Sequence, residues 1–439
     1  MRNRVIKLNP SQLLLIMFIS FITLGTILLK IPAASTEPIS WLDALFTATS
    51  AMTVTGLVVV DTGTAYTLFG ELVIVGLIQV GGLGIMSFAV LIYIMLGKKI
   101  GMKERLLIQQ SLNQTSLGGV INLVRYLFIF SFTIEFIAMI LLSIRWIPEF
   151  GWSKGIYFSF FHSISAFNNA GFGLLPDSLM QYVGDPIINI VISFLFIIGG
   201  IGFTVLVDLK HKKRFKKLSL HTKLMLVGSF VVNIIAMLFI FFVEYSNPKT
   251  LGGLDWAGKL WGSFFQAVVP RTAGFNSLDI ASLNEPTILF IIILMFIGAG
   301  SASTGGGIKL TTFLVIIFSV INYIKAKDEI VISNRSISQT SILKALAIAT
   351  TSIVFILLCL IILTITEQKP FLMILFEVVS AFGTVGLSMG ITGTLTSIGK
   401  CIIILVMFFG KLGPLTLAYT LAKPDKAKIK YPKEDVLTG

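Results

Sequence analysis

Residues 50–57 read SAMTVTGL, and a stretch of this kind returns three more times along the chain. Each copy passes from apolar and small residues to a glycine, and an apolar residue follows that glycine. The further copies read SAFNNAGF at 165–172, VVPRTAGF at 268–275 and SAFGTVGL at 380–387. The closing glycines are 115, 103 and 112 residues apart, and a phenylalanine stands ten residues before each one: Phe46, Phe161, Phe264 and Phe376. Four copies in register indicate an internal repeat.

Membrane-length apolar runs flank every copy. Eight runs reach the roughly 20 residues that a helix needs to cross a bilayer: 11–30, 69–96, 121–147, 187–207, 222–243, 287–324, 342–366 and 398–420. Between the members of each pair lies an apolar stretch too short to span, at 41–52, 155–167, 258–269 and 371–382. We therefore predict an all-α integral membrane protein with four membrane-pore-membrane repeats. Its eight transmembrane helices and four re-entrant pore helices would surround one pseudo-fourfold ion pore.

The composition agrees with this class and argues against others. Hydrophobic residues make up 55% of the 439 residues and charged residues 13%, about half the charge of an average soluble domain. Cys359 and Cys401 lie in apolar runs, and His162 stands alone in the second short stretch, so no metal or catalytic constellation is visible. We predict that the chain is not an enzyme and binds no covalent cofactor. The predicted divisions are 1–97, 98–208, 209–325 and 326–420 for the repeats, and 421–439 for a basic cytoplasmic tail.

Basic residues predict the orientation in the membrane. If both termini are cytoplasmic and eight crossings follow, 23 of the 34 Lys and Arg residues fall on the cytoplasmic side, as the positive-inside rule requires. This predicts a multi-pass protein of the plasma membrane. The densest basic run, 210–217, could suggest a nucleic-acid partner. Topology and attraction to anionic lipid explain it better, so we expect contact with membrane lipid and none with nucleic acid.

The four loops are suited to hold a cation. Each follows a short helix, whose C-terminus carries roughly half a negative charge, and irregular backbone inside a membrane survives only where it is buried or lines a wet cavity. Glycine at the closing position allows a positive φ, so backbone carbonyls can turn inward and replace the hydration shell of an ion. No matching loop position is acidic, which argues against a divalent-cation site. The predicted filter residues are Val54, Thr55, Gly56, Asn169, Ala170, Gly171, Thr272, Ala273, Gly274, Thr384, Val385 and Gly386.

Arg271 breaks the symmetry of the four loops, three residues before Gly274. In a cation pore its side chain should point away from the axis, and we expect it to bond to backbone carbonyls or to a nearby acid. Asn168 and Asn169 are predicted to support the second loop through side-chain hydrogen bonds. Ordinary loop formation is an equally good interpretation of both asparagines.

The third repeat carries a glycine-rich interruption. Its second run, 287–324, would measure about 57 Å as one helix, and three consecutive glycines in its middle cost about 1 kcal/mol each in a helix. We expect a mobile loop below the filter that acts as a gate; a merely kinked helix is the alternative. Lys309 and Lys411 are predicted to lie at comparable depth in the membrane. Intramembrane charge usually faces a cavity, although both lysines could instead snorkel to the interface. The predicted gate residues are Gly298, Gly300, Ser301, Ser303, Thr304, Gly305, Gly306, Gly307, Lys309 and Lys411.

The four loops, the phrase PRTAGF at 270–275 and the loop 298–309 resemble the Trk/Ktr/HKT superfamily of potassium transporters, over residues 11–420 and most closely the Ktr-type membrane subunit. The resemblance implies four membrane-pore-membrane units around one ion path and a gating intramembrane loop. Gly56 in the first loop implies a preference for potassium, because sodium-preferring relatives have serine there. The resemblance also implies a homodimer and a cytosolic ring of regulatory subunits of the RCK/KTN type that bind ATP, ADP or a dinucleotide. Sodium stimulation is implied too, although no sodium site is visible.

Two other functions compete with a potassium pore. A secondary transporter of an organic or anionic substrate, coupled to monovalent cations, would use helix N-termini facing an anion, and Arg271 and Lys411 give it some support. The loops at helix C-termini argue against it. A membrane-embedded enzyme would need a catalytic constellation that the sequence does not offer.

Overall fold

The structure is a computed structural model that describes residues 10–84, 87, 120–327 and 329–413. The end of the predicted run 69–96, the boundary at 97/98, the end of the run 398–420 and the tail 421–439 lie outside the described residues. Apart from loops and a two-stranded hairpin, β1 (Val331–Ile332) and β2 (Arg335–Ser336), the described chain is helical. Large apolar side chains such as Ile137, Phe230 and Ile361 are exposed along the longest helices. Exposed apolar surface of this extent is typical of a membrane protein.

Each predicted repeat contains a long first helix, a short helix, a loop and a second long segment. The first unit has α1 (Pro10–Lys30), η1 (Pro32–Ala34), α2 (Trp41–Thr53), α3 (Thr62–Ala65) and α4 (Leu68–Leu83). The second has α7 (Val120–Phe167), η2 (Met180–Tyr182), α8 (Pro186–Ile201) and α9 (Phe203–His211). The third has η3 (Phe215–Lys217), α10 (Leu220–Glu244), α11 (Trp256–Val268), η4 (Ile280–Ser282), α12 (Glu285–Phe296) and α13 (Leu310–Ile324). The fourth has α14 (Gln339–Thr366), α15 (Phe371–Gly383), η5 (Thr392–Thr394) and α16 (Ser397–Leu412).

In α7, the first long helix and the short helix of the second unit run together. Gly151, with φ 80° and ψ 170°, marks the sharp bend between them, and Pro148 precedes it. The residues after this bend therefore correspond to α2, α11 and α15 in the other units.

The helix that begins the second long segment is short in every unit, at 16 residues in α4, α8 and α16 and 12 residues in α12. α4, α8 and α16 end at Gly84, Gly202 and Gly413, which all have positive φ (88°, 102° and 81°). α8 and α9 meet at 90° across Gly202, and α12 and α13 are separated by the loop 297–309. Four helices in the described chain are long and apolar enough to cross a membrane, or five if α8 and α9 form one span. The described residues therefore do not contain eight full-length spans, and the ends of the runs 69–96 and 398–420 lie outside them.

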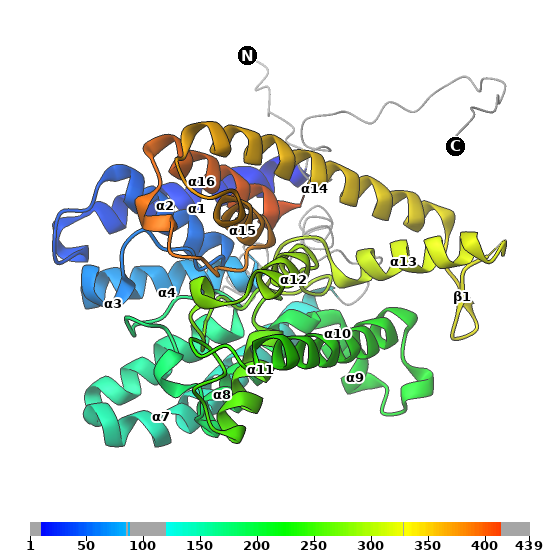
Figure 1. Ribbon diagram of the computed structural model, residues 1–439, viewed down its shortest axis with the longest axis horizontal. Helices are drawn as coiled ribbons and strands as arrows, with labels where there is room; N and C mark the ends of the chain where they lie inside the picture. Colours follow the sequence, from blue (N-terminus) through cyan, green and yellow to red (C-terminus); the bar gives the residue numbers. More distant parts are fainter. Residues whose placement is uncertain (1–9, 85–86, 88–119, 328, 414–439) are drawn as a thin grey trace, which may run out of the picture.

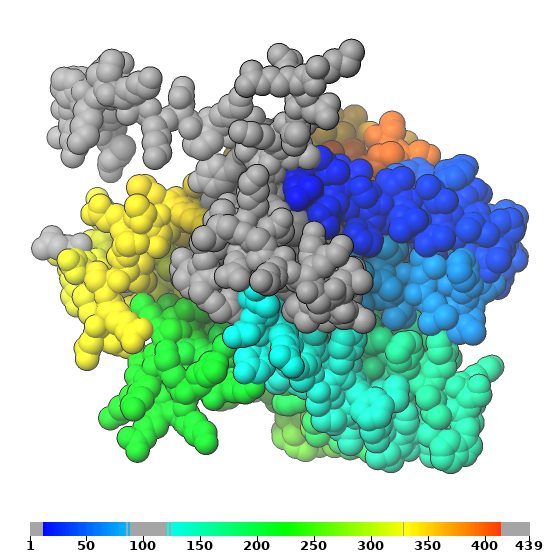
Figure 2. All heavy atoms as spheres, turned by 180° about the vertical axis from the view of Figure 1, so that it is seen from behind, coloured from blue at the N-terminus to red at the C-terminus, as the bar shows by residue number. Residues whose placement is uncertain are grey.

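The units follow one another in a closed ring. The second long segment of each unit packs against the short-helix part of the next: α4 on α7, α8 on α11, α12 on α15, and α16 on α2. The last contact joins the fourth unit to the first. Figure 1 shows the units in chain order around the molecule, and Figure 2 shows the same order of colours from the opposite side.

Glycines in these segments allow close packing on the short helices. A β-carbon on Gly81 would lie 1.9 Å from the carbonyl oxygen of Met52, four residues before the closing Gly56. The corresponding distances are 1.9 Å from Gly199 to Phe167 O and 2.0 Å from Gly410 to Phe382 O. No side chain fits at such distances. In three units, the same glycine therefore lets the second segment lie against the carbonyl end of its own short helix.

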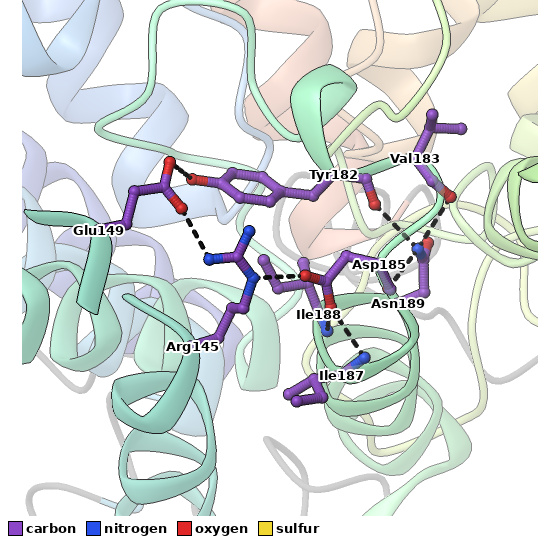
Figure 3. Close-up of polar contacts among 8 residues, drawn as sticks. All are labelled: Arg145, Glu149, Tyr182, Val183, Asp185, Ile187, Ile188 and Asn189. Atoms are coloured by element: carbon purple, nitrogen blue, oxygen red, sulfur yellow. Dashed lines mark hydrogen bonds and ion pairs between the residues drawn. The ribbon is translucent and has the colours of Figure 1, made fainter. Parts of the chain in front are cut away.

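Polar contacts join the end of the first long helix to the start of the second in each unit. In the second unit, Arg145 bonds to Glu149 at 2.9 Å and to Asp185 at 2.6 Å, and Tyr182 donates to Glu149 at 2.8 Å (Figure 3). Asp185 also accepts the backbone N–H groups of Ile187 and Ile188, the first free donors of α8. The short helix and loop are inserted between these two points, so the contacts fix both ends of the inserted segment.

Carboxylates serve the same purpose in the third and fourth units. Buried Glu244 accepts bonds from Asn284 N at 2.9 Å and from Thr287 Oγ1 at 2.5 Å. Glu367 accepts from Thr396 N at 3.2 Å and from Thr396 Oγ1 at 2.5 Å. In the first unit, Thr67 donates to Ala33 O at 2.6 Å. The groups that form the bonds differ between units, but in each unit they join the end of the first long helix to the start of the second long segment.

Candidate functional site: four converging loops

The four loops share one backbone conformation. The closing glycines Gly56, Gly171, Gly274 and Gly386 have φ values of 90°, 69°, 79° and 90°. The residue two positions earlier is also left-handed in every loop, with φ 51° at Val54, 57° at Asn169, 77° at Thr272 and 49° at Thr384. Three of these are β-branched, for which this conformation is a genuine outlier. Strained residues cluster at functional sites, and here the strain recurs at one position of all four loops.

The backbone N–H groups of the loops turn back toward the short helices. In the first loop, Val54 N donates to Ala51 O at 3.1 Å, Thr55 N to Ser50 O at 2.8 Å and Gly56 N to Ser50 Oγ at 3.1 Å. Thr384 N and Val385 N repeat the pattern at 3.1 and 2.9 Å in the fourth loop. These bonds satisfy the last carbonyls of the short helices, which would otherwise have no partner.

The loop carbonyls remain available as a result. Among the described residues, none of the twelve backbone carbonyls at 54–56, 169–171, 272–274 and 384–386 accepts a hydrogen bond. Buried carbonyls are normally paired with protein or water. A dozen unpaired carbonyls gathered at four loops can therefore coordinate a ligand with oxygen-seeking chemistry, such as a metal cation.

The four loops converge on one another. A β-carbon on Gly56 would lie 2.4 Å from Ala170 O, and one on Gly171 would lie 2.7 Å from Gly274 Cα. On Gly274 it would lie 2.7 Å from Val385 O, and on Gly386 it would lie 2.2 Å from Thr55 O. Each loop therefore contacts the next one along the chain, and the fourth loop contacts the first. Glycine is required at these positions because any side chain would strike the neighbouring loop.

A vestibule of about 320 Å³ opens on one side of the loops. All four closing glycines line it, together with the carboxylates Asp61 and Asp177 and the hydroxyls of Ser388 and Thr392. Negative charge in a concave entrance raises the local concentration of cations.

The glycine-rich segment 298–309 lies on the other side of the loops. Its Thr304 hydroxyl donates to Asn169 Oδ1 at 3.0 Å, and Gly306 N donates to Thr384 Oγ1 at 2.8 Å. It is also anchored to the helix breaks, since Gly300 N donates to Gly200 O at 2.7 Å and Gly307 N to Gly410 O at 3.3 Å. The segment thus forms a non-helical bridge beneath the converging loops. The predicted gate residues Gly298, Gly300, Ser301, Ser303, Thr304, Gly305, Gly306 and Gly307 all belong to it.

Both lysines at this level bond to carbonyls of the segment. Lys411 Nζ donates to Thr304 O at 2.5 Å, and Lys309 Nζ donates to Gly305 O at 2.6 Å and to Gly306 O at 3.3 Å. Lys411 therefore fastens the segment to α16, whereas Lys309 closes a turn within the segment. Both amines thus bond to backbone carbonyls inside the protein.

Arg271 points away from the loops, but its partners differ from those expected. Its guanidinium donates to Asn233 Oδ1 and Ser229 Oγ on α10, each at 3.1 Å. We expected backbone carbonyls or an acid; neutral side chains of the neighbouring helix supply the acceptors instead. Such a contact depends on the packing of α10, which spacing within the loop does not reveal.

Asn168 occupies the corresponding position of the second loop and bonds to three groups. Its Nδ2 atom donates to Gln79 Oε1 at 2.6 Å, to Ile164 O at 2.9 Å and to Glu135 Oε1 at 3.3 Å. Gln79 in turn donates to both oxygens of Glu135 at 3.1 Å. Asn169 does not support its own loop: its Nδ2 donates to Thr272 Oγ1 of the third loop at 3.0 Å.

Polar residues nine positions before the closing glycines have a role that was not predicted. Thr47 accepts the Tyr66 hydroxyl at 3.0 Å, and His162 Nε2 accepts Leu174 N at 3.4 Å. Glu377 accepts the hydroxyls of Ser388, at 2.8 Å, and of Thr392. Each holds the chain as it leaves a loop; in the third loop the position is the apolar Phe265. A polar residue in the middle of an apolar short helix was the available sequence sign. Glu135 and Gln79 gave no comparable sign, because their meeting depends on the packing of α4 against α7.

The fold and the site define the class of protein: a helical, multi-pass membrane protein whose four units meet in loops of free backbone carbonyls. A family model described as cation transport protein, TrkH, matches residues 7–430. The chain belongs to this family, as the resemblance of its loops predicted.

Known proteins of the same kind match over nearly their full length. The Ktr system potassium uptake protein B of Bacillus subtilis is 60% identical over 99% of this chain and 98% of its own. The protein of the same name from Vibrio alginolyticus is 42% identical over 99% and 96%. The crystal structure of the potassium transporter TrkH from Vibrio parahaemolyticus shares the fold, with a TM-score of 0.74, 20% identity and coverage of 96% of this chain and 87% of that one.

Proposed function

We propose that the chain takes up potassium across the plasma membrane through a selectivity filter made by the four converging loops. The observation that carries the proposal is the ring of contacts among Gly56, Gly171, Gly274 and Gly386, with the adjacent carbonyls unpaired. Neutral carbonyl oxygens favour monovalent cations, whereas divalent ions are usually held by carboxylates. The names of the two relatives above, both potassium uptake proteins, support potassium as the ion.

We further propose the arrangement in the membrane. The repeats 1–97, 98–208, 209–325 and 326–420 each contribute two crossings, the second interrupted at its glycine cluster, and one re-entrant pore helix. Both termini, the tail 421–439 and the basic run 210–217 lie in the cytoplasm, where the run contacts anionic lipid. The vestibule with Asp61 and Asp177 then faces outward.

The segment 298–309 is the proposed gate. It lies directly beneath the filter and is held there by Lys411 and by the side chains of Asn169 and Thr384. A short non-helical segment fixed by a few hydrogen bonds is a low-stability element of the kind that moves in switching. We propose that opening releases these bonds.

The working form is proposed to be a homodimer on a cytosolic ring of RCK/KTN-type subunits that bind ATP, ADP or a dinucleotide. Support comes from the resemblance to Ktr-type membrane subunits and from relatives named as parts of a Ktr system. Sodium stimulation belongs to the same proposal. Affinity purification of the tagged chain should recover the ring subunit at fixed stoichiometry; recovery of the chain alone under mild detergent would contradict this part.

Growth of a potassium-uptake-deficient cell tests the central proposal. The chain, expressed together with its cytosolic partner, should restore growth at low potassium. A matched negative control is a chain with Gly274→Leu, whose side chain would strike Val385 O and the second loop. Correct membrane insertion without rescue would overturn the assignment.

Secondary transport of an organic or anionic substrate is the alternative function. Arg271 and Lys411 were its support, yet both bond within the protein to Asn233, Ser229 and Thr304. The lining of the vestibule contains the carboxylates Asp61 and Asp177, which repel an anion. Competition of uptake by other alkali cations, and none by organic anions, is the expected result.

A further inference from the structure

A chain of three buried side chains joins the second loop to two helices. Glu135 lies on α7, Gln79 on α4, and Asn168 directly before the left-handed Asn169. Among the described residues, the carboxylate of Glu135 bonds only to the neutral amides of Gln79 and Asn168. Acidic side chains within a membrane segment are rare and usually functional. A buried carboxylate that is held by amides alone, directly behind a loop, therefore calls for a functional explanation.

The carboxylate determines which way the amide of Gln79 faces. Carboxylate oxygens accept hydrogen bonds, whereas an amide has one end that donates and one end that accepts. Gln79 Nε2 lies 3.1 Å from both oxygens of Glu135, and Gln79 Oε1 accepts Asn168 Nδ2 at 2.6 Å. The nitrogen end of Gln79 is thus fixed toward α7 and its oxygen end toward the second loop. With an amide in place of Glu135, Gln79 would be free to turn over, and its nitrogen would then face the nitrogen of Asn168.

Asn168 connects this orientation to the loop backbone. Its Nδ2 atom also donates to Ile164 O at 2.9 Å, in the last turn of the short helix. A β-carbon on Gly82 would lie 2.1 Å from Asn168 Oδ1, so the side chain packs directly on the backbone of α4 and has little space to adjust. Two residues further on, Ala170 O lies beside Gly56 of the first loop. A displaced Asn168 would therefore shift carbonyls that belong to the converging loops.

The corresponding residues of the other loops have different connections. Thr53 bonds within its own short helix and to Thr55, and Gly383 has no side chain. Arg271 donates to two neutral side chains of α10. The second and third loops are thus linked, at the same position, to the first long helix of their own unit. Among the described residues, only the link of the second loop uses a carboxylate.

We propose that Glu135 and Gln79 are positioning residues that act through Asn168 to set the preference of the second loop for potassium over sodium. The proposal rests on the proposed function. Carbonyls discriminate between ions by their number and position, so a loop that is fixed from behind discriminates more sharply. Glu135 does not touch the ion. It removes the alternative orientation of Gln79, and thereby a second position of the loop.

Exchange of the carboxylate and the amide between α7 and α4 tests the proposal. Glu135→Gln keeps the volume of the side chain but releases the amide of Gln79. The ratio of potassium to sodium competition against rubidium uptake should fall about fivefold, the factor that corresponds to one neutral hydrogen bond. Gln79→Glu places two carboxylates together and should lower the ratio at least as much. The double variant, Gln79→Glu with Glu135→Gln, again pairs one carboxylate with one amide and should recover most of the ratio of the parent.

Asn168→Ala tests the route by which Glu135 acts. Residues that act through one network have non-additive effects. Glu135→Gln should therefore change the ion ratio much less in the Asn168→Ala background than in the parent. An equal change in both backgrounds would show that the charge of Glu135 acts on the ion directly, and it would overturn the proposed route.

Glu244→Gln is the matched control for stability. Glu244 is also buried among hydrogen-bond donors, but it bonds to Asn284 and Thr287 at the start of α12 and not to a loop. The control should lower the thermal unfolding temperature in detergent and leave the ion ratio unchanged.

Two results would overturn the inference: an unchanged ion ratio in Glu135→Gln, or a double variant with no better ratio than Glu135→Gln alone. Both variants keep the side-chain volumes, so the outcome does not depend on the stability of Gln79→Glu. Rubidium uptake by the parent separates the two proposals. Uptake with an unchanged ratio in Glu135→Gln refutes the positioning role alone, whereas absence of uptake in the parent refutes the proposed function.

Discussion

The closing glycines connect the geometry of the loops with the proposed ion selectivity. Gly56 combines a φ of 90° with a neighbouring carbonyl, Ala170 O, only 2.4 Å from the position of a β-carbon. The other three closing glycines have the same combination against their own neighbours. Any larger residue must therefore move a carbonyl of the adjacent loop, and ion preference depends on the positions of those carbonyls.

We predict that Gly56→Ser relaxes the preference for potassium over sodium. The serine side chain displaces Ala170 O, so the carbonyl oxygens of the loops fit potassium, the larger ion, less well. The serine hydroxyl also offers an additional ligand. Competition of rubidium uptake by potassium and by sodium measures the ratio. Gly76→Ser on α4, where the space around the glycine is open, should behave like the parent. An unchanged ratio in Gly56→Ser would remove this loop from the filter.

A second prediction at this scale concerns Glu377, which holds Ser388 and Thr392 at the vestibule wall. Glu377→Ala leaves both hydroxyls without an acceptor, at a cost of about 2 kcal/mol in the free energy of unfolding, and it should reduce uptake. Glu377→Gln keeps an acceptor and should retain most of the activity. Thermal unfolding in detergent and uptake in cells are the two measurements. Equal loss in both variants would mean that the charge, not the hydrogen bonds, matters.

At the scale of elements, the ends of the helices that begin the second segments explain how backbone groups become free beside the four loops. α4, α8 and α16 stop at glycines with positive φ, and α12 stops before the segment 298–309. Freed backbone groups need partners in a membrane, and the segment supplies them: Gly200 O and Gly410 O accept bonds from Gly300 N and Gly307 N. The breaks and the segment therefore depend on each other.

We predict that Lys411→Met loosens the segment and raises uptake in the absence of the cytosolic partner. The change removes the bond to Thr304 O, which is charge-assisted and worth about 2 kcal/mol, while it keeps the length of the side chain. Uptake with and without the partner gives the readout. Lys325→Met, at the exposed end of α13, is the control. Unchanged dependence on the partner would show that Lys411 does not hold the gate.

At the scale of the whole molecule, the ring closes where the fourth unit meets the first. Lys400 on α16 bonds to Asp43 at 2.7 Å, and Asp43 stands at the start of α2, where Ser40 also donates to it at 2.7 Å. Burial raises the pKa of Asp43, but the bonds from Lys400 and Ser40 outweigh burial and leave the pKa below its usual 3.8. The ion pair thus stabilises the contact between α16 and α2 while Asp43 is ionised.

The fourth prediction follows from the sign of that shift. The pKa of Asp43 is lower in the folded state than in the unfolded chain. The ion pair with Lys400 therefore contributes fully to the free energy of unfolding above pH 3.8, and this contribution is lost as the pH falls through the pKa of the folded state. The melting temperature of the parent should therefore decrease toward acid more steeply than that of Asp43→Asn, and the two curves should converge at low pH. At neutral pH the variant should be less stable by about 2 kcal/mol. Parallel curves would contradict a role for this ion pair.

Hydrophobic runs, the fourfold repeat and the closing glycines could be read from the sequence, because membrane burial and positive φ restrict which residues are possible at a position. The same pattern predicted the family and the twelve loop residues. The contacts between units could not be read in this way. Arg271 bonds to Asn233 and Ser229. Asn169 bonds to Thr272 and Thr304, and Glu135 bonds to Gln79. Such partners lie on separate helices, and only the packing of those helices decides which polar groups meet.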